Sequence, residues 1–345
     1  MMKKLICIPV ILVFLAIAIT SVYAEQDRTK DFYKGARMTF IVPHAPGGGY
    51  DLWARSLAPY LEKYTGARIL VQNMSGAGGS LAGGFLYNNA KPDGLTIGIM
   101  PMPGMAIVTL LDFEGVSFEL DKFCYIGRVE AMDRILVASK ASGFKTIADM
   151  QKAKSPIRYG TTDAFAETGV DSSLLAEIFG LNMKIIPGYQ GSKAYLLALI
   201  AGRELDALSM SMGAFDRYIE SGDITAVAVL GEERLSKFPK CPTFLESPIK
   251  SHEAKAYADI ITNYIKGGRA IVAPPKVPPE KIQFLEKALS AALKEPELMK
   301  WANKQGFNIN PLSGKESKQL VERILASVPK AERPKLKQVI MKKYY

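Results

Sequence analysis

The sequence predicts an α/β protein built from mainly parallel sheets that are flanked by helices. Short apolar and β-branched runs alternate along the chain with amphipathic segments of helical periodicity. Alternation of this kind places helices on both faces of a parallel sheet. The chain has 345 residues, of which 48% are hydrophobic. This length is sufficient for two domains with separate cores.

The first 24 residues predict a cleaved secretory signal peptide. Lys3 and Lys4 precede an apolar stretch at residues 5–19, and the triplet at residues 22–24 has the small or compatible residues of a cleavage point. The alternative is a membrane anchor, but an apolar stretch of about 15 residues is shorter than the roughly 20 that cross a bilayer. We therefore expect an exported mature chain that begins near Glu25.

The first strand and the first helix of the mature chain are predicted on either side of a glycine turn. Residues 38–42 are apolar or β-branched, which is typical of a buried strand. Residues 52–64 predict a helix, because Trp53, Leu57 and Leu61 recur at helical spacing. Gly66 is a typical helix end, and Pro59 predicts a kink inside the helix.

The remaining elements continue the alternation. A helix is expected to end near Asn88, and a later one carries Ile282, Leu285 and Leu289 on one face. Ser313 and Glu316 have the spacing of a capping box and predict the start of the last helix. Further strands are predicted at residues 68–72, 95–100, 157–160, 183–186, 205–209 and 225–230.

Composition and motifs exclude several classes of protein. The net charge of +10 favours anionic partners, but the lysines are scattered and the chain is exported, so nucleic acid is not expected. The two histidines, His44 and His252, lack the spacing of a metal site, and we expect no metal or cofactor. The sequence has no G-x-S-x-G motif and no evident pair of base and nucleophile. It therefore predicts a binding protein and not an enzyme.

Two cysteines, Cys124 and Cys241, belong to the predicted mature chain. Export permits a disulfide, but two cysteines so far apart in sequence do not form a disulfide scaffold. Whether they are bridged depends on their separation in space.

The glycine turn at residues 46–51 does not have the pattern of a nucleotide site. A P-loop requires Lys and Ser or Thr after its last glycine, whereas Gly49 is followed by Tyr50 and Asp51. Neither this turn nor the one at residues 76–81 has the spacing G-x-G-x-x-G of dinucleotide sites.

A small carboxylate is the better ligand for the glycine turn. Glycines allow close approach of the backbone, and the helix N-terminus behind them offers free N–H groups with a partial positive charge. Asp51 would lie in the first helical turn. It could cap the helix, orient the loop, or accept a hydrogen bond from a ligand hydroxyl or amine.

Several motifs together resemble one known family. These are PHAPGGGYD at residues 43–51, VQN with GAGG at 71–79, KPDGLT at 91–96, YQGS at 189–192, GRELD at 202–206, and PTF with APPKVP at 242–278. In this order they resemble the extracytoplasmic solute receptors of tripartite tricarboxylate transporters, the TctC/Bug group. The resemblance covers nearly all of residues 38–320.

This resemblance implies a two-domain, periplasmic-binding-protein (flytrap) fold with a ligand cleft between the domains. Domain 1 would comprise residues 25–131 and 231–345, and domain 2 the inserted residues 132–230. The family implies a periplasmic, monomeric receptor that captures a small organic acid. It would deliver this ligand to a transporter with one large and one small membrane subunit.

When the site residues of the family are carried over by position, the resemblance implies a ligand site formed by both domains. Domain 1 would contribute His44, Pro46, Gly47, Gly48, Gly49, Tyr50, Asp51, Gly78 and Gly79. Domain 2 would contribute Thr161, Thr162, Asp163, Tyr189, Gln190, Gly191, Ser192, Asp206 and Ser209.

Three features depart from the family pattern. His44 replaces an aromatic residue, and either pairs with a ligand carboxylate or serves as a hydrogen-bonding residue at a strand end. Residues 161–169 form a longer loop than the family's and carry Asp163 and Glu167. If these acids face the cleft, they disfavour a tricarboxylate and favour an amine-bearing or weakly charged acid. The tail beyond Ser327 is also longer than the family's.

Two other functions fit the same residues less well. A receptor of this fold could sense its ligand and dock to a signalling protein, which sequence alone does not separate from transport. An exported enzyme would require the base and nucleophile that the motifs lack.

Overall fold

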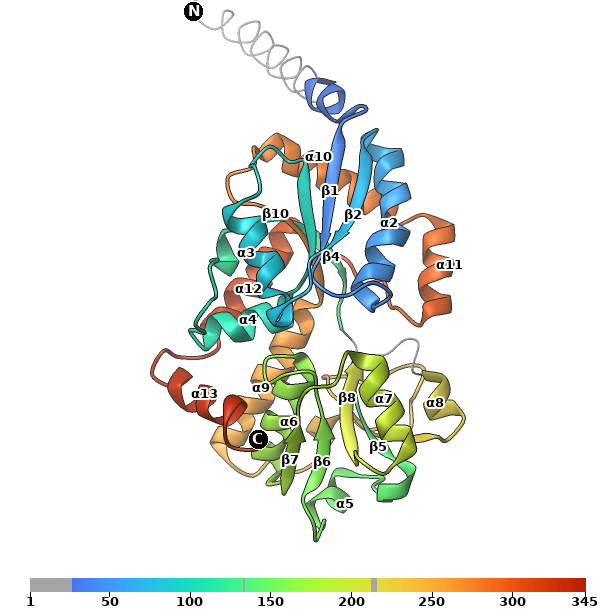
Figure 1. Cartoon of the computed structure of the whole chain (residues 1–345), viewed down its shortest axis with the longest axis vertical. Coiled ribbons are helices and arrows are strands. Elements are labelled where there is room, and N and C mark those ends of the chain that lie inside the picture. The colour runs from blue at the N-terminus through green and yellow to red at the C-terminus, as the bar shows by residue number, and fades with distance from the viewer. Residues whose placement is uncertain (1–26, 133, 212–215) are drawn as a thin grey trace, which may run out of the picture.

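The computed structural model describes residues 27–132, 134–211 and 216–345. The predicted signal peptide and its cleavage point lie outside these residues. The chain folds into two lobes, each built around one sheet and flanked by helices (Figure 1). The predicted α/β fold class is therefore confirmed. No helix in the described ranges is long and apolar enough to cross a membrane.

The sheet of the first lobe has six strands in the order β11-β4-β10-β3-β1-β2. Its three N-terminal strands are parallel, and the others run antiparallel to their neighbours. The strands are β1 (Arg37–Val42), β2 (Arg68–Asn73), β3 (Thr96–Pro101), β4 (Cys124–Glu130), β10 (Arg269–Ala273) and β11 (Leu312–Ser313).

The sheet of the second lobe has five strands in the order β7-β6-β8-β5-β9. Strands β7, β6 and β8 are parallel, while β5 is antiparallel to both of its neighbours. The strands are β5 (Arg134–Ser139), β6 (Ile157–Gly160), β7 (Met183–Ile186), β8 (Ala207–Ser211) and β9 (Ile224–Val229).

Both sheets are thus mixed, with a parallel half and an antiparallel half, and are not mainly parallel as the sequence predicted. Parallel neighbours need a crossover connection, usually a helix, and the parallel halves have such connections. Strands β4 and β5 follow each other directly in the chain but lie in different sheets. The chain therefore passes from the first lobe to the second between these two strands, with no crossover helix.

Helices cover both faces of the first sheet. Helices α2 (Gly49–Thr65) and α10 (Pro279–Ala292) pack together on one face, with α11 (Pro296–Gln305) beside them (Figure 1). The other face carries α3 (Ser80–Asn88), α4 (Met102–Leu110) and α12 (Gly314–Ala326). The helices assigned to the second lobe are α5 (Ile147–Gln151), α6 (Glu167–Phe179), α7 (Ser192–Ala201) and α8 (Asp216–Glu220).

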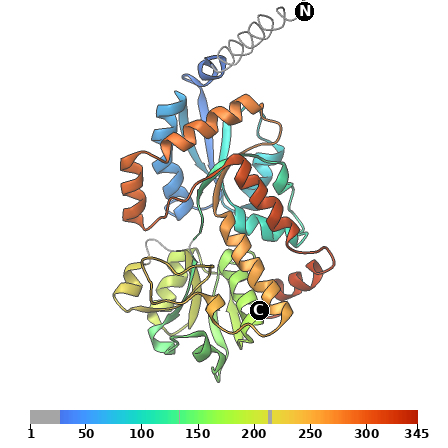
Figure 2. The same ribbon diagram turned by 180° about the vertical axis from the view of Figure 1, so that it is seen from behind.

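Two further helices connect the lobes. Helix α9 (His252–Gly267) packs on α6 of the second lobe and on α4 and α12 of the first, and Figure 2 shows it running between the lobes. Helix α13 (Arg333–Met341) packs on α6. The larger hydrophobic core cluster consequently contains residues of both lobes.

The local predictions agree with the structure in most places. Helix α2 begins at Gly49, continues through Pro59 and ends at Thr65, and its C-cap Gly66 has a left-handed φ of 77°. Ser313 and Glu316 form the predicted capping box, but the helix that they start, α12, is not the last one, since α13 follows. The strand predicted at residues 205–209 is displaced, since β8 begins at Ala207. Cys124 and Cys241 are both free thiols.

Candidate functional site

The glycine loop, residues 46–49, is held in place by Asp51. One Asp51 carboxylate oxygen accepts the Gly47 N–H at 2.9 Å. The carboxylate also receives Arg55 Nε at 3.0 Å and Asn73 Nδ2 at 2.9 Å. Asp51 is only 3% exposed, so its carboxylate is engaged within the protein. This arrangement corresponds to the loop-orienting role among those considered for Asp51.

Electrostatics favour an ionised Asp51. Burial opposes ionisation, but hydrogen bonds from Arg55, Gly47 and Asn73 outweigh it and lower the pKa of the carboxyl. The negative charge therefore persists at neutral pH and keeps the loop fixed.

Gly48 is the N-cap of α2 and offers no side chain to the helix. The first backbone N–H groups of an α-helix have no partner within the helix. Here they lie behind exposed residues Pro46 and Gly47. The start of this 17-residue helix is therefore suited to an anionic group.

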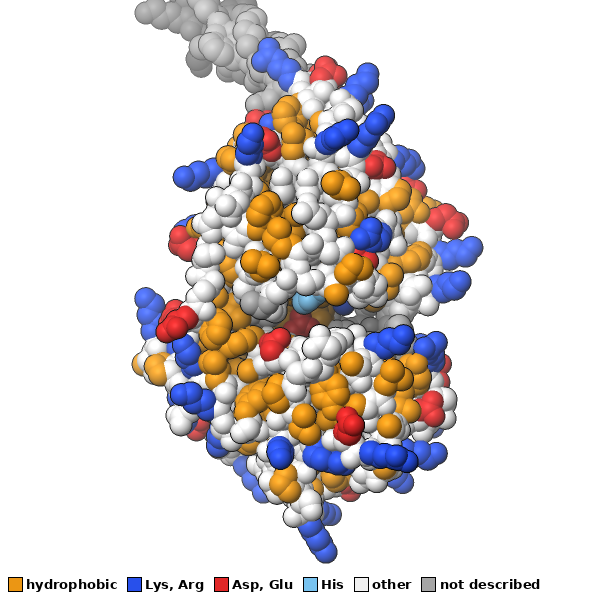
Figure 3. Space-filling model, in the orientation of Figure 1, with side chains coloured by type: hydrophobic (Ala, Val, Ile, Leu, Met, Phe, Trp, Pro, Cys, Tyr) orange, Lys and Arg blue, Asp and Glu red, His pale blue; other side chains and the backbone are white. Residues whose placement is uncertain are grey.

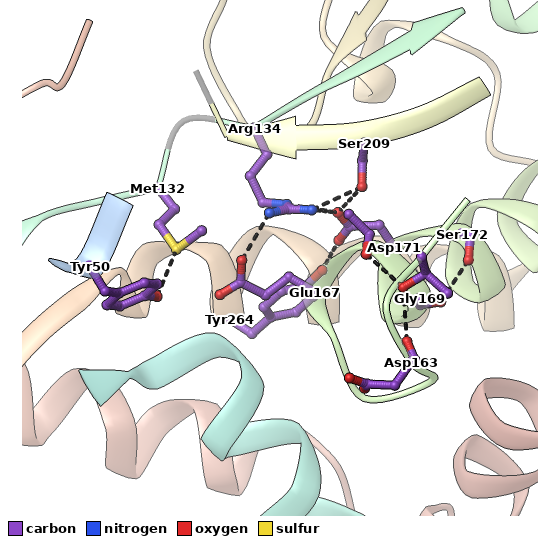
Figure 4. Close-up of polar contacts among 12 residues, drawn as sticks. Tyr50, Met132, Arg134, Asp163, Glu167, Gly169, Asp171, Ser172, Ser209 and Tyr264 are labelled. Carbon is purple, nitrogen blue, oxygen red and sulfur yellow. Dashed lines mark hydrogen bonds and ion pairs between the residues drawn. The ribbon is translucent and has the colours of Figure 1, made fainter. Parts of the chain in front are cut away.

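His44 and Tyr50 pack against each other beside the glycine loop, with ring centroids 4.7 Å apart. The Tyr50 hydroxyl donates to Met132 Sδ at 3.5 Å and points toward the second lobe (Figure 4). Burial and the positive charge of Arg269 lower the pKa of His44 to about 4, although Asp163 opposes this. His44 is thus neutral at neutral pH in the structure.

Arg269 supports Tyr50 from the first residue of β10. Its guanidinium lies 4.8 Å from the Tyr50 ring centroid and 5.4 Å from that of Phe307, and it forms an ion pair with Glu130. A Cβ atom placed on Gly49 would lie 3.0 Å from an Arg269 nitrogen. The third glycine of the loop therefore allows this buried arginine to lie directly behind the helix start.

The second glycine turn brings the first lobe into contact with the second. Gly78 and Gly79 have φ values of 60° and 97°, in the left-handed region. A Cβ on Gly79 would lie 2.7 Å from Pro101 Cγ, so the position requires glycine. A Cβ on Gly78 would lie 4.0 Å from Phe165 of the second lobe.

The facing loop of the second lobe, residues 161–166, is stabilised by its own side chains. Asp163 Oδ1 accepts the N–H groups of Phe165 at 2.9 Å and Ala166 at 2.7 Å. Buried Thr161 donates to the Asp163 carbonyl at 2.9 Å, and Thr162 Oγ1 lies 3.3 Å from Asp163 Oδ2. We call this segment the facing loop. It leads directly into α6.

A buried network lies at the start of α6 (Figure 4). Arg134 donates to Asp171 at 2.7 Å and to Glu167 at 3.0 Å. It also donates to Ser209 at 2.9 Å, and the Ser209 hydroxyl donates to Asp171 at 2.5 Å. Tyr264 of α9 adds a hydrogen bond to Asp171. The network thus joins β5, α6, β8 and α9.

Two carboxylates in this network share one guanidinium. Burial raises the pKa of both Glu167 and Asp171, and Arg134 only partly compensates. The Glu167 side chain is 18% exposed, whereas that of Asp171 is fully buried. Burial, and after it the charge of Glu167, raises the pKa of Tyr50 across the lobe boundary. Glu167 is therefore the member of the network that faces the first lobe.

Other predicted site residues lie apart from this network. Asp206 receives a bidentate contact from Arg158, with the shortest distance at 2.7 Å. The Tyr189 hydroxyl donates to Glu204 at 3.3 Å. The remaining members of this turn are exposed Gln190, the α7 N-cap Gly191 and the first α7 residue Ser192.

The turn at residues 188–191 nevertheless borders the facing loop. The Gly188 N–H donates to the Thr162 carbonyl at 3.0 Å, and the Tyr189 N–H donates to the Thr161 carbonyl at 3.3 Å. Backbone groups of this turn, and not the Tyr189 hydroxyl, therefore lie beside the predicted site.

Figure 3 shows the surface hollowed between the lobes, with acidic and histidine side chains visible inside. A small pocket also lies where the chain passes between the lobes. It is lined by Glu130, Ala131, Met132, Ser211, Arg269, Gly306, Phe307 and Asn308. In the described ranges, no three His, Cys, Asp or Glu side chains are grouped so that they could hold a metal ion.

Sequence reasoning missed Arg134, Asp171, Tyr264, Arg269 and Glu130. A signal for the two arginines was present, since each begins an otherwise apolar strand. A charge at such a position requires a buried partner. The partners come from distant segments, so the sequence alone did not identify them.

The fold and these facing loops define a two-lobed binding protein. The sequence matches the profile of the Tripartite tricarboxylate transporter family receptor over residues 53–333. The chain therefore belongs to this family of periplasmic solute-binding proteins, as its motifs predicted.

Individual relatives agree with this assignment. BugT of Bordetella pertussis is 29% identical over 294 residues, which span 80% of this chain and 82% of BugT. A UPF0065 protein of Agrobacterium vitis is 28% identical over 289 residues, which span 82% and 79% of the two chains.

Solved structures have the same fold. The periplasmic binding protein BugD superposes with a TM-score of 0.68 at 25% identity, covering 85% of this chain and 97% of BugD. MatC from Rhodopseudomonas palustris with bound malate gives a TM-score of 0.68 at 21% identity, with coverages of 88% and 99%. Another R. palustris protein, solved with adipate, superposes with a TM-score of 0.71 at 20% identity, covering 88% of this chain and 97% of that protein.

Proposed function

We propose that this protein is a periplasmic receptor that captures a small organic acid between its two domains and passes it to a tripartite membrane transporter. The large and small membrane subunits of that transporter would be its partners, and it would act as a monomer. Domain 1 would comprise residues 25–131 and 231–345, and domain 2 residues 132–230, with α13 at the end of domain 1 packed on α6 of domain 2. No bond is broken in this function, because ligand capture needs only a shift between open and closed arrangements.

The observation that carries the proposal is the start of α2. Its N-cap, Gly48, supplies no side-chain hydrogen bond, and the loop before it is exposed. A ligand carboxylate at this position would accept the first N–H groups of the helix, in charge-assisted bonds that contribute roughly 1.5–3 kcal/mol each. Asp51 keeps the loop in the required shape from behind.

The second lobe supports a more specific ligand class. The facing loop uses Asp163 to accept its own N–H groups, and Glu167 presents a partly exposed carboxylate. Glu167 can therefore accept a hydrogen bond from a ligand, whereas Asp163 is engaged within its own loop. We propose an acid that carries an amine, amide or hydroxyl group, in preference to a tricarboxylate. Malate, bound to the structural neighbour MatC, is an acid with such a hydroxyl.

A thermal-shift panel tests the proposed ligand class. The mature chain is unfolded and refolded to remove carried ligand, and its melting temperature is measured with monocarboxylates, dicarboxylates, citrate and amino acids. A ligand that binds only the folded state raises this temperature. We expect shifts from mono- and dicarboxylates that bear a donor group and none from citrate, which bears a hydroxyl but has a third carboxylate. A shift from citrate alone would contradict the proposed ligand class, and no shift from any acid would contradict the carboxylate function.

Delivery needs its own measurement. Vesicles that contain the large and small membrane subunits should accumulate the bound acid only when this receptor is added. Uptake that is equal without the receptor would contradict the transport role.

A further inference from the structure

The match to the family profile covers residues up to 333, and the chain continues from there to residue 345. We call residues 333–345 the C-terminal strap. We propose that the strap supports the ligand site from outside it, by positioning the facing loop, residues 161–166, against the first lobe. This inference rests on the proposed function of that loop.

The strap is fixed to the second lobe along α6 and β7. The Ile185 N–H donates to the Tyr344 carbonyl at 2.8 Å, so the strap lies at the β7 edge. The Tyr344 hydroxyl donates to Glu177 of α6 at 2.6 Å. Apolar side chains Val339 and Ile340 are buried in the shared core. In Figure 1 the C-terminus accordingly lies beside α6 and β7.

The strap also contacts the first lobe, at the turn that follows α4 and contains Asp112. Lys337 Nζ donates to the Asp112 carbonyl at 3.4 Å, and Arg333 lies 3.9 Å from the Asp112 carboxylate. The next residue, Phe113, packs on Phe165 of the facing loop with ring centroids 4.0 Å apart. The strap therefore holds the turn against which the facing loop packs.

The end of the strap reaches the base of the facing loop. A Cβ on Gly169 would lie 2.5 Å from the Asp163 carbonyl oxygen and 3.0 Å from the Tyr345 hydroxyl. Gly169 thus lies between the facing loop and the last residue of the chain. Tyr345 supports the loop from behind while Phe113 supports it from the first lobe.

These contacts make Tyr344 and Tyr345 positioning residues. They touch the elements that carry Asp163 and Glu167, and they are not placed in contact with a ligand. Loss of the strap should loosen the facing loop while the sheets remain folded.

Hydrogen exchange tests this inference without a ligand. Amide exchange of residues 161–170 is measured by mass spectrometry in the mature chain, in a chain that ends at Lys342, and in Tyr345→Phe. We expect at least tenfold faster exchange of this segment in the shortened chain and a smaller increase in Tyr345→Phe. Exchange of β1 and β5 should not change. The matched control is Lys342→Ala, an exposed position in the same strap.

The outcome does not depend on whether the proposed ligand is correct. Unchanged exchange of residues 161–170 in the shortened chain would overturn the inference, even if an acid binds. Increased exchange spread equally over β1 and β5 would overturn it too, since the strap would then only stabilise the fold. If the shortened chain fails to fold, Tyr344→Phe replaces it, because this variant keeps the backbone bond at β7 and loses only the contact with Glu177.

Discussion

Glu167 and Asp171 together carry more negative charge into the protein than Arg134 can balance. Arg134 is 2% exposed and is shared between Glu167 and Asp171. Asp171 receives further hydrogen bonds from Ser209 and Tyr264, so Glu167 is the less supported of the two carboxylates. Its raised pKa follows from this inequality and from burial.

Glu167→Gln should therefore stabilise the ligand-free protein at neutral pH. A carboxyl whose pKa is raised by folding contributes stability below its ordinary pKa of 4.5, and this contribution is lost as the pH rises through the folded value. We expect the variant to have a larger free energy of unfolding than wild type at pH 7–8, with the gain vanishing near pH 4. Urea unfolding measures this, and exposed Glu114→Gln is the control. A loss of stability at pH 8 would contradict the assignment.

His44 predicts a pH effect of the opposite sign. Its pKa falls from 6.5 to about 4 on folding, so its contribution to stability is present above pH 6.5 and is lost as the pH falls toward 4. The full effect is at most about 3 kcal/mol. His44→Gln should flatten the decline of unfolding free energy between pH 6.5 and 4, whereas His252→Gln at the exposed start of α9 should not. Equal declines in both variants would show that His44 is not the responsible group.

The glycine turns are the elements in which sequence and structure agree most closely. The pattern at residues 46–51 predicted a turn before a helix, and the structure has that turn, with Asp51 accepting the Gly47 N–H. The buried network around Arg134 could not be predicted in the same way. Its members come from β5, α6, β8 and α9, and only the folded chain brings these elements together.

Gly79→Ala should disrupt the second glycine turn in two ways, through backbone strain and through a steric clash with Pro101. A Cβ would lie 2.7 Å from the rigid Pro101 ring, in addition to the strain of φ 97°. We expect a loss of about 2–3 kcal/mol in the free energy of unfolding. The matched control is Gly222→Ala, where φ is 76° and no atom lies within 4 Å of the added Cβ. Equal losses in both variants would show that the close approach to Pro101 does not contribute to the loss.

At the scale of the whole molecule, α9 joins the lobes into one cooperative unit. Its sequence is amphipathic, but the prediction did not place it between the lobes, because that position depends on contacts with α4, α6 and α12. Buried Ile261 lies in the core cluster that the two lobes share. The position of α13 was not predicted from the sequence either, because α13 contacts α6, which lies far away in the sequence.

The shared core predicts a single unfolding transition. Both tryptophans, Trp53 and Trp301, lie in the first lobe, so fluorescence follows that lobe while far-ultraviolet circular dichroism follows both. The two urea transitions should coincide, and Ile261→Ala should shift both together by about 2–5 kcal/mol. Separate transitions in the wild-type chain would contradict a common core.

The central claim is that the start of α2 binds the ligand carboxylate. Gly48 has an extended backbone that accepts any residue, and a Cβ there would lie 3.5 Å from its nearest neighbour, the Ala45 carbonyl oxygen. In Gly48→Asp, the new carboxylate would cap α2 and occupy the N–H groups proposed for the ligand. Gly48→Ala adds the same Cβ without a carboxylate and serves as the control.

The most direct measurement is calorimetric titration of the refolded wild type and these two variants with the acid that gives the largest thermal shift. We predict that Gly48→Asp keeps its melting temperature and loses at least tenfold in affinity, while Gly48→Ala stays within about threefold of wild type. Undiminished affinity in a folded Gly48→Asp protein would contradict the claim that the α2 N-terminus holds the ligand carboxylate.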